Sequence, residues 1–187
     1  MMPRTLHKLD PMACISAMQK FIRRADERRA MEFACELIHT SKPFFSMVAN
    51  RLEVISHEDV GLADPQAVLF AGMAIEQARR HYDAKKPGKC RMMIGNAIRA
   101  LCRARKSREG DHFQAAIGVP NREQNRIPEI PDFAYDMHTS RGRRAGKGLD
   151  HFRRESARLV PPPKPDVYET EAYGLWHWKS QQTNGAD

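Results

Sequence analysis

Apolar residues recur every three to four positions through most of the first 118 residues, and polar residues fill the positions between them. This spacing predicts helices that each bury one face, and no stretch of useful length shows the alternation typical of a β-strand. The predicted helices begin after Asp10, Asp26, Ser41, Asp64, Gly88 and Ser107, and the last of them is expected to end near Gly118. We therefore predict an all-α bundle of about six helices.

The stretch from Ser56 to Pro65 carries the clearest local signals for a helix end followed by a helix start. Gly61 can adopt the left-handed conformation that ends a helix. Asp64 can then cap the next helix through its side chain, with Pro65 at the first helical position, where a missing N–H is not needed. Because Glu58 and Asp59 lie at this helix end, we interpret them as capping and interhelical partners.

Prolines become frequent after residue 118, and they break up any long helix in this part of the chain. We predict three parts: a flexible leader over residues 1–9, a helical domain over 10–118, and an extended Pro- and Arg-rich arm over 119–187. Within this arm, only a short helix near residues 149–159 is expected to form.

Several classes of protein are disfavoured by what the sequence lacks. No run of about 18 apolar residues and no signal-peptide block is present, so a soluble, cytoplasmic protein without a membrane partner is expected. The four cysteines have no close pairing, which predicts buried free thiols in a reducing compartment. No metal site is expected, because His138 and His151 have no further ligands at short spacing.

Lys and Arg number 31 against 23 Asp and Glu, and the resulting net charge of +8 favours an anionic partner such as nucleic acid. The candidate nucleic-acid-binding residues form two groups, one in the arm and one at the end of the fifth predicted helix. The first group is Arg141, Arg143, Arg144, Lys147, Arg153 and Arg154, and the second is Arg103, Arg105 and Lys106. A solvated basic loop, or a contact with acidic residues of another subunit, remains the alternative for the first group. A favourable interaction with the helix dipole is a sufficient explanation for the second.

Two further clusters have a chemical and a structural interpretation. His57, Glu58 and Asp59 can exchange protons in principle, but consecutive helical residues point to different faces, which disfavours catalysis. Trp176 and Trp178 in the far tail can stack on single-stranded bases, although aromatic residues more often anchor a segment to an apolar groove.

Two segments resemble signatures of one protein family. Residues 16–23, S-A-M-Q-K-F-I-R, and residues 56–67, S-H-E-D-V-G-L-A-D-P-Q-A, are similar to the corresponding segments of the RarA/MgsA family of AAA+ ATPases, which includes the Werner-helicase-interacting protein. A weaker similarity follows over residues 89–107, so the resemblance covers about residues 14–117. It implies a clamp-loader-like C-terminal domain that assembles as a homotetramer and makes residues 10–118 an oligomerisation domain.

The ATPase module of that family is not expected in this chain. A phosphate-binding loop needs G-x-x-x-x-G-K-[S/T], whereas Gly142–Gly148 is one residue short between its glycines and ends in Gly instead of a hydroxyl residue. We therefore expect no ATP hydrolysis, no catalytic residues and no cofactor.

These observations lead to one principal hypothesis and two alternatives. The principal hypothesis is a non-enzymatic oligomerisation and interaction module in DNA replication, recombination or repair. The first alternative is a nucleic-acid-binding protein that acts through its basic arm. The second is a regulatory subunit of a separate AAA+ ATPase, or a partner of other replication proteins.

Overall fold

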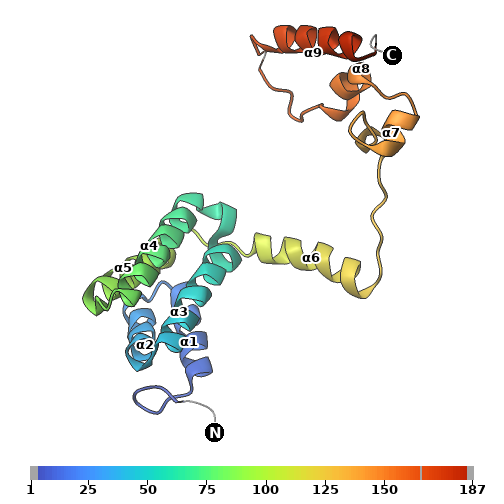
Figure 1. Cartoon of the computed structure of the whole chain (residues 1–187). Helices are drawn as coiled ribbons and strands as arrows, with labels where there is room; N and C mark the ends of the chain where they lie inside the picture. The colour runs from blue at the N-terminus through green and yellow to red at the C-terminus, as the bar shows by residue number, and fades with distance from the viewer. Residues whose placement is uncertain (1–3, 165, 185–187) are drawn as a thin grey trace. The chain divides into compact units, whose positions relative to one another are not determined.

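The computed structural model describes residues 4–164 and 166–184, and the protein is all-α throughout this part of the chain (Figure 1). It divides into two compact units, residues 1–126 and 127–187. The helices of the first unit are α1 (Pro11–Arg23), α2 (Glu27–Thr40), α3 (Lys42–Ile55), α4 (Pro65–Asp83), α5 (Pro87–Arg103) and α6 (Glu109–Glu123). Two short turns, the π-helical η1 (Ser56–Val60) and the 3₁₀-helical η2 (Gly61–Ala63), join α3 to α4. The fold class predicted from the periodicity is confirmed.

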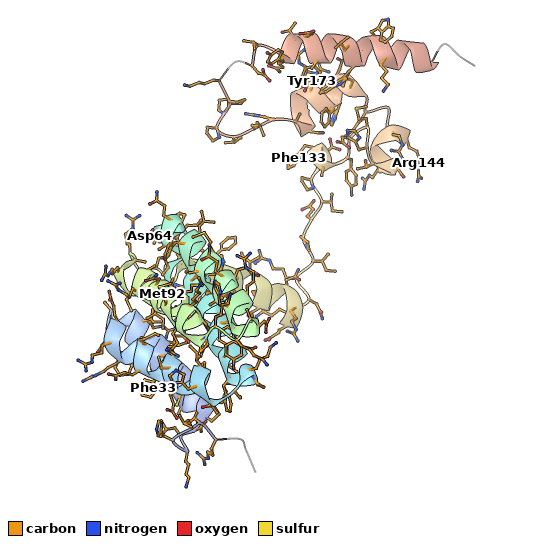
Figure 2. The ribbon with its side chains drawn as sticks, turned by 60° about the vertical axis from the view of Figure 1, so that its left-hand side comes forward. Phe33, Asp64, Met92, Phe133, Arg144 and Tyr173 are labelled. Carbon is orange, nitrogen blue, oxygen red and sulfur yellow. The ribbon has the colours of Figure 1, made fainter. Side chains whose placement is uncertain are left out.

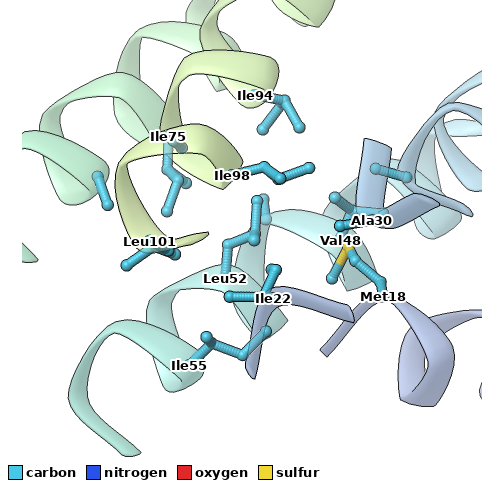
Figure 3. Packing of buried hydrophobic residues seen from close by; sticks show 14 of the residues in the cluster. Met18, Ile22, Ala30, Val48, Leu52, Ile55, Ile75, Ile94, Ile98 and Leu101 are labelled. Atoms are coloured by element: carbon cyan, nitrogen blue, oxygen red, sulfur yellow. The ribbon is translucent and has the colours of Figure 1, made fainter. Parts of the chain in front are cut away.

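The core of the first unit lies between α1, α2, α3, α4 and α5. Figure 3 shows Met18, Leu52 and Ile98 meeting there with other aliphatic side chains, and all three are fully buried. The helices α1 and α2 form one hairpin and α4 and α5 form another, with α3 packed against both. Apolar burial at about 25 cal/mol per Å² makes this cluster the main source of stability.

The helix starts predicted after Asp10, Asp26, Ser41 and Asp64 are present in the structure, whereas α5 begins at Pro87, two residues before its predicted start, because proline is favourable at the first helical position. The side chain of Asp10 accepts a hydrogen bond from the Met12 N–H at 2.8 Å, and that of Asp26 accepts one from the Arg29 N–H at 3.0 Å. Asp64 caps α4 through the Ala67 N–H at 3.1 Å. Each of these bonds satisfies a backbone donor that has no partner within its own helix.

Gly61 makes the turn between η1 and η2 possible. Its φ of +53° is as predicted, but its ψ of −134° places it outside the left-handed helical region. A residue with a side chain is strained at this φ, although an added Cβ would meet no atom within 4 Å. The glycine is therefore required by backbone conformation and not by lack of space.

Helix α6 differs from its prediction in two ways. It continues beyond Gly118 and through Pro120 to Glu123, and none of its residues is buried. Pro120 cannot donate a hydrogen bond to the carbonyl of Ala116 and its ring crowds that group, but the Pro120 carbonyl still accepts the Gln124 N–H at 3.1 Å and closes the helix. Within the described residues 4–126, the first unit thus has the expected six α-helices, and the buried apolar residues of its core come mainly from α1 to α5.

The second unit contains more helix than the predicted extended arm. It comprises η3 (Asp132–Ala134), α7 (Ser140–Arg144), α8 (Leu149–His151), η4 (Phe152–Ser156) and α9 (Glu169–Asn184). The short helix expected near 149–159 corresponds to α8 and η4. The arm was predicted to be extended because of its prolines, but these lie before α7 and between η4 and α9, so α9 is free of them. None of the described helices combines the length and the apolar character needed to cross a membrane.

Candidate functional site

An ion-pair network holds the start of α6 and the turn η1 against α1. Asp59 is 2% exposed, and each of its carboxylate oxygens accepts a hydrogen bond from Arg23 Nε at 2.9 Å. Arg23 Nη2 also binds Glu58 at 2.9 Å, and Gln19 Nε2 donates to both carboxylates. Arg108 reaches Glu58 at 3.2 Å from the other side. These contacts, from Asp59 and Glu58 above all, raise the pKa of Arg23 in spite of its partial burial.

This geometry gives Glu58 and Asp59 a structural role. Both carboxylates point at guanidinium groups, and the Asp59 carbonyl also accepts the Ser107 N–H at 3.0 Å. The Ser56 hydroxyl donates to the Glu53 carbonyl at 2.7 Å. The side chains of Glu58 and Asp59 thus connect η1 to α1 and to the start of α6.

The three candidate cations at the end of α5 are engaged within the first unit. Arg103 forms an ion pair with Glu27 at 2.5 Å, and Arg105 donates to the Ala63 carbonyl at 2.7 Å. Lys106 Nζ donates to the Leu101, Cys102 and Ala104 carbonyls at 2.6–3.0 Å. Burial lowers the pKa of Lys106. These contacts identify Lys106 as a cap for the last carbonyls of α5.

In the second unit, the glycine-rich basic segment folds into a short, well-defined helix. The Thr139 hydroxyl caps α7 through the Gly142 N–H at 3.0 Å. At the other end, the Gly146 N–H binds the Arg143 carbonyl and the Lys147 N–H binds the Gly142 carbonyl, both at 3.0 Å. With Gly146 at φ +69°, these two bonds form a Schellman motif.

Gly142 lies directly against the backbone of Asp136. A Cβ at this position would come within 2.0 Å of the Asp136 carbonyl oxygen, so any other residue would force the two segments apart. The sequence contains no local signal for this role of Gly142, because the close approach comes from a segment outside α7. Only the Asp-x-x-Thr pattern before the helix, with Thr139 as its cap, gave a local signal.

The basic residues of the second unit differ in how freely they are exposed. Lys147 is held by an ion pair with Asp132 at 2.7 Å, and Arg143 donates to the His138 carbonyl at 3.0 Å. Arg144, labelled on α7 in Figure 2, and Arg154 are exposed and form no hydrogen bond or ion pair with the described residues.

Two further arginines of this unit lie over aromatic rings. The guanidinium carbon of Arg141 is 4.3 Å from the ring centre of Tyr135, and that of Arg153 is 4.5 Å from Tyr173. Trp176 makes an edge contact with Tyr173, and both tryptophans are about half exposed.

The positive charge of the chain is unevenly distributed. Residues 1–126 hold 22 Lys and Arg against 14 Asp and Glu, whereas residues 127–187 hold nine of each. The second unit is thus neutral as a whole, and its basic character is confined to residues 141–158, with seven cations and two acids. The net charge of the whole chain therefore does not mark the arm as basic.

The first unit has an apolar groove of about 1220 Å³ that the sequence analysis did not identify. It lies between η1, η2, the start of α4 and the first turns of α6. Leu62 and Phe113, which line it, are 93% and 69% exposed. Helix α4 exposes Leu69, which also lines the groove, and Phe70 and Met73, which do not. The helical spacing of apolar residues predicts that they form a buried face, and it cannot distinguish the apolar residues that stay exposed to solvent.

The potential metal ligands and the thiols of the described residues lie apart from one another or are buried. Within residues 4–164 and 166–184, His, Cys, Asp and Glu side chains form no group of three that could hold a metal ion. All four cysteines are free thiols, of which Cys35 is partly exposed and the others are buried. Burial raises the pKa of Cys102 to about 11, which makes it unreactive.

The fold is an all-α module in which ion pairs join α1, η1 and the start of α6. Comparison with known proteins gives the family. The chain belongs to the MgsA AAA+ ATPase C-terminal family, whose sequence model matches residues 25–157. The resemblance seen in residues 56–67 is thereby confirmed, and the match also includes the basic segment with α7.

Replication-associated recombination protein A of Bacillus subtilis is similar to this chain. The two are 32% identical over 141 residues, which cover 73% of this chain and 31% of the relative. The chain therefore matches about a third of the length of this relative. The family match is to its C-terminal region and does not include the ATPase module.

Proposed function

We propose that this chain is a non-enzymatic oligomerisation and interaction module that acts in DNA replication, recombination or repair. Membership of the family and the name of the B. subtilis relative support the setting in replication and recombination. The observation that carries the oligomerisation is the apolar band on α4, formed by Leu69, Phe70 and Met73, which are 74%, 41% and 53% exposed. Three adjacent apolar side chains on one helix form the centre of an interface, because their burial is favourable.

The expected assembly is a homotetramer, and light scattering over a range of concentrations measures it directly. A mass of four times 21.4 kDa is the expected result. Met73→Glu should shift the mass to smaller species, because it places a carboxylate in the buried band. Met92→Glu is the matched control, since Met92 is similarly exposed, 58% against 53% for Met73, but lies on α5 outside the band. A monomer at all concentrations, or equal effects of both substitutions, contradicts the proposal.

A second candidate function is binding of nucleic acid by the second unit. Arg144 and Arg154, exposed and without an ionic partner among the described residues, favour it. Phosphate contacts release counterions, so each lost contact lowers the slope of log affinity against log salt by about 0.7 to 0.9.

Fluorescence anisotropy with labelled oligonucleotides tests this candidate. The double variant Arg144→Ala/Arg154→Ala should lower the salt slope by about 1.5. Arg28→Ala/Arg29→Ala on α2 removes the same charge from exposed positions and should leave the slope unchanged. Weak binding that both variants reduce equally would show a general charge effect. If no DNA binds and a AAA+ ATPase co-purifies, the chain acts as a subunit of that enzyme.

A further inference from the structure

The groove of the first unit has an acidic rim and an apolar floor. Its floor is formed by the aliphatic and aromatic residues Val54, Val60, Leu62, Val68, Leu69 and Phe113. Glu53, Glu58, Glu109 and Asp111 are its charged residues, and no lysine or arginine lines it. The first unit carries eight more cations than anions, so this acidity is a local feature and does not follow from the composition.

The arginines that contact these carboxylates, Arg79 and Arg108, are not among the residues that line the groove. Arg79 binds Glu53 at 2.9 Å, and Arg108 binds Glu58 and Asp111 at 3.2 and 2.5 Å. Glu53 nevertheless keeps about half of its side chain exposed. Glu109 is exposed and forms no ion pair with the described residues. At least two carboxylates of the rim are therefore available to a ligand.

The size and shape of the groove fit a helix better than a small molecule. Its volume of about 1220 Å³ exceeds the range of about 300–1,000 Å³ that is usual for small ligands, and the groove is open to solvent. Gly61, Ala63 and Gly110 line it with little bulk, so the backbone of a ligand helix can approach closely. An amphipathic helix contacts such a groove through residues at i, i+3, i+4 and i+7.

Charge also decides between the possible occupants. A twofold contact that paired this groove with the groove of a second copy would bring two acidic rims together, and like charges repel. DNA and anionic lipid surfaces are disfavoured for the same reason. A helix with apolar residues on one face and lysine or arginine beside them complements both the floor and the rim.

We propose that this groove is a docking site for a basic amphipathic helix of a partner protein. The apolar side chains of the ligand helix contact Leu62 and Phe113, and its cations bind Glu109 and Glu53. The groove adjoins the band on α4, because Leu69 belongs to both, but Met73 does not line the groove and Phe113 does not belong to the band. Substitutions at Met73 and at Phe113 therefore test the two proposals separately.

The test uses the full chain and two synthetic peptides as probes. Both peptides are about four helical turns long with leucine at i, i+3, i+4 and i+7; one has lysine at the remaining positions and the other has glutamate. Fluorescence anisotropy should show binding of the leucine–lysine peptide and none of the leucine–glutamate peptide. Because the protein has a net charge of +8, unspecific attraction would produce the opposite preference.

Three variants locate the binding. Phe113→Gln should weaken binding of the leucine–lysine peptide at least about tenfold, the loss typical of a central apolar contact. Glu109→Lys should weaken it several-fold, more at low salt than at high salt. Glu32→Lys makes the same change of charge at an exposed position on α2 and should leave the affinity unchanged.

Three outcomes would overturn the proposal. The protein could bind both peptides with equal affinity, or Phe113→Gln could leave the affinity for the leucine–lysine peptide unchanged. The third outcome is that Glu109→Lys and Glu32→Lys change this affinity equally. Light scattering on the same samples tests the alternative occupant. If Phe113→Gln or added peptide lowers the solution mass, the groove binds a second copy and not a partner. Failure of the oligomerisation proposal appears separately, in the comparison of Met73→Glu with Met92→Glu.

Discussion

Substitution of Arg23 by Met tests whether the network around Asp59 holds the first unit together. Methionine keeps an aliphatic stem of similar length but removes the guanidinium group that binds Asp59 and Glu58. The Asp59 carboxylate would then remain 2% exposed, with Gln19 at 3.1 Å and Arg108 at 3.8 Å as its remaining side-chain partners among the described residues.

The structure sets the expected magnitude. Removal of one partner of a buried ion pair costs about 3–5 kcal/mol, because an uncompensated charge stays buried. Arg23 is itself 31% exposed, and Arg108 compensates part of the charge, so we expect a loss of about 2–3 kcal/mol in the free energy of unfolding. Arg79→Met provides the matched control: Arg79 is 27% exposed, but its partner Glu53 is 49% exposed. Such a pair contributes about 0–1 kcal/mol.

The assay is urea unfolding at one fixed protein concentration, since assembly stabilises the folded state. Both tryptophans lie in α9, so their fluorescence reports on the second unit, and far-UV circular dichroism is needed to follow the first. Equal losses for Arg23→Met and Arg79→Met would refute the reasoning. A second check is Asp59→Asn in the Arg23→Met background, which should recover about 1 kcal/mol or more by removing the unpaired charge.

Three further predictions concern the core, the turn and the N-terminal segment. Leu52→Ala should lower the free energy of unfolding by about 2–5 kcal/mol in the same assay, because Leu52 is fully buried. Gly61→Ala should cost about 1 kcal/mol or more because of its positive φ, whereas Gly72→Ala in α4 should be neutral or stabilising. Burial alone would raise the pKa of Glu36, but bonds from Thr5 and His7 lower it to about 2. The ionised Glu36 side chain therefore contributes fully to stability above pH 4.5, and this contribution is lost as the pH falls towards 2. In urea unfolding, the free energy of unfolding of Glu36→Gln should fall less over this pH range than that of the unsubstituted protein.

The features that the sequence could predict depend on neighbouring residues. Asp10, Asp26 and Asp64 cap helices that begin one residue later, and Gly61 supplies a positive φ within its own turn. In each case the residue and the backbone groups that it affects lie within three or four positions of each other. The sequence alone therefore shows both. The family signature around Gly61 was recognisable for the same reason.

The features that the sequence could not predict depend on contacts between residues far apart in the chain. Arg103 and Arg144 look alike in the sequence, but Arg103 binds Glu27, 76 residues away, while Arg144 has no ionic partner in the described structure. The groove likewise joins residues 50–69 to residues 107–114. The open faces of α4 and α6 also follow the helical period, so periodicity alone assigned their apolar residues to the core.

The distribution of charge makes deletion of the second unit a sharp test of nucleic-acid binding. Residues 127–187 carry no net charge, so a chain of residues 1–126 keeps the net charge of +8. If affinity for DNA came from overall attraction, it would survive the deletion, because the long-range field depends on net charge. If it comes from the arginines around α7, anisotropy should show its loss although the net charge is unchanged. Retained affinity with an unchanged salt slope would assign DNA binding to the first unit and contradict the role given to Arg144 and Arg154.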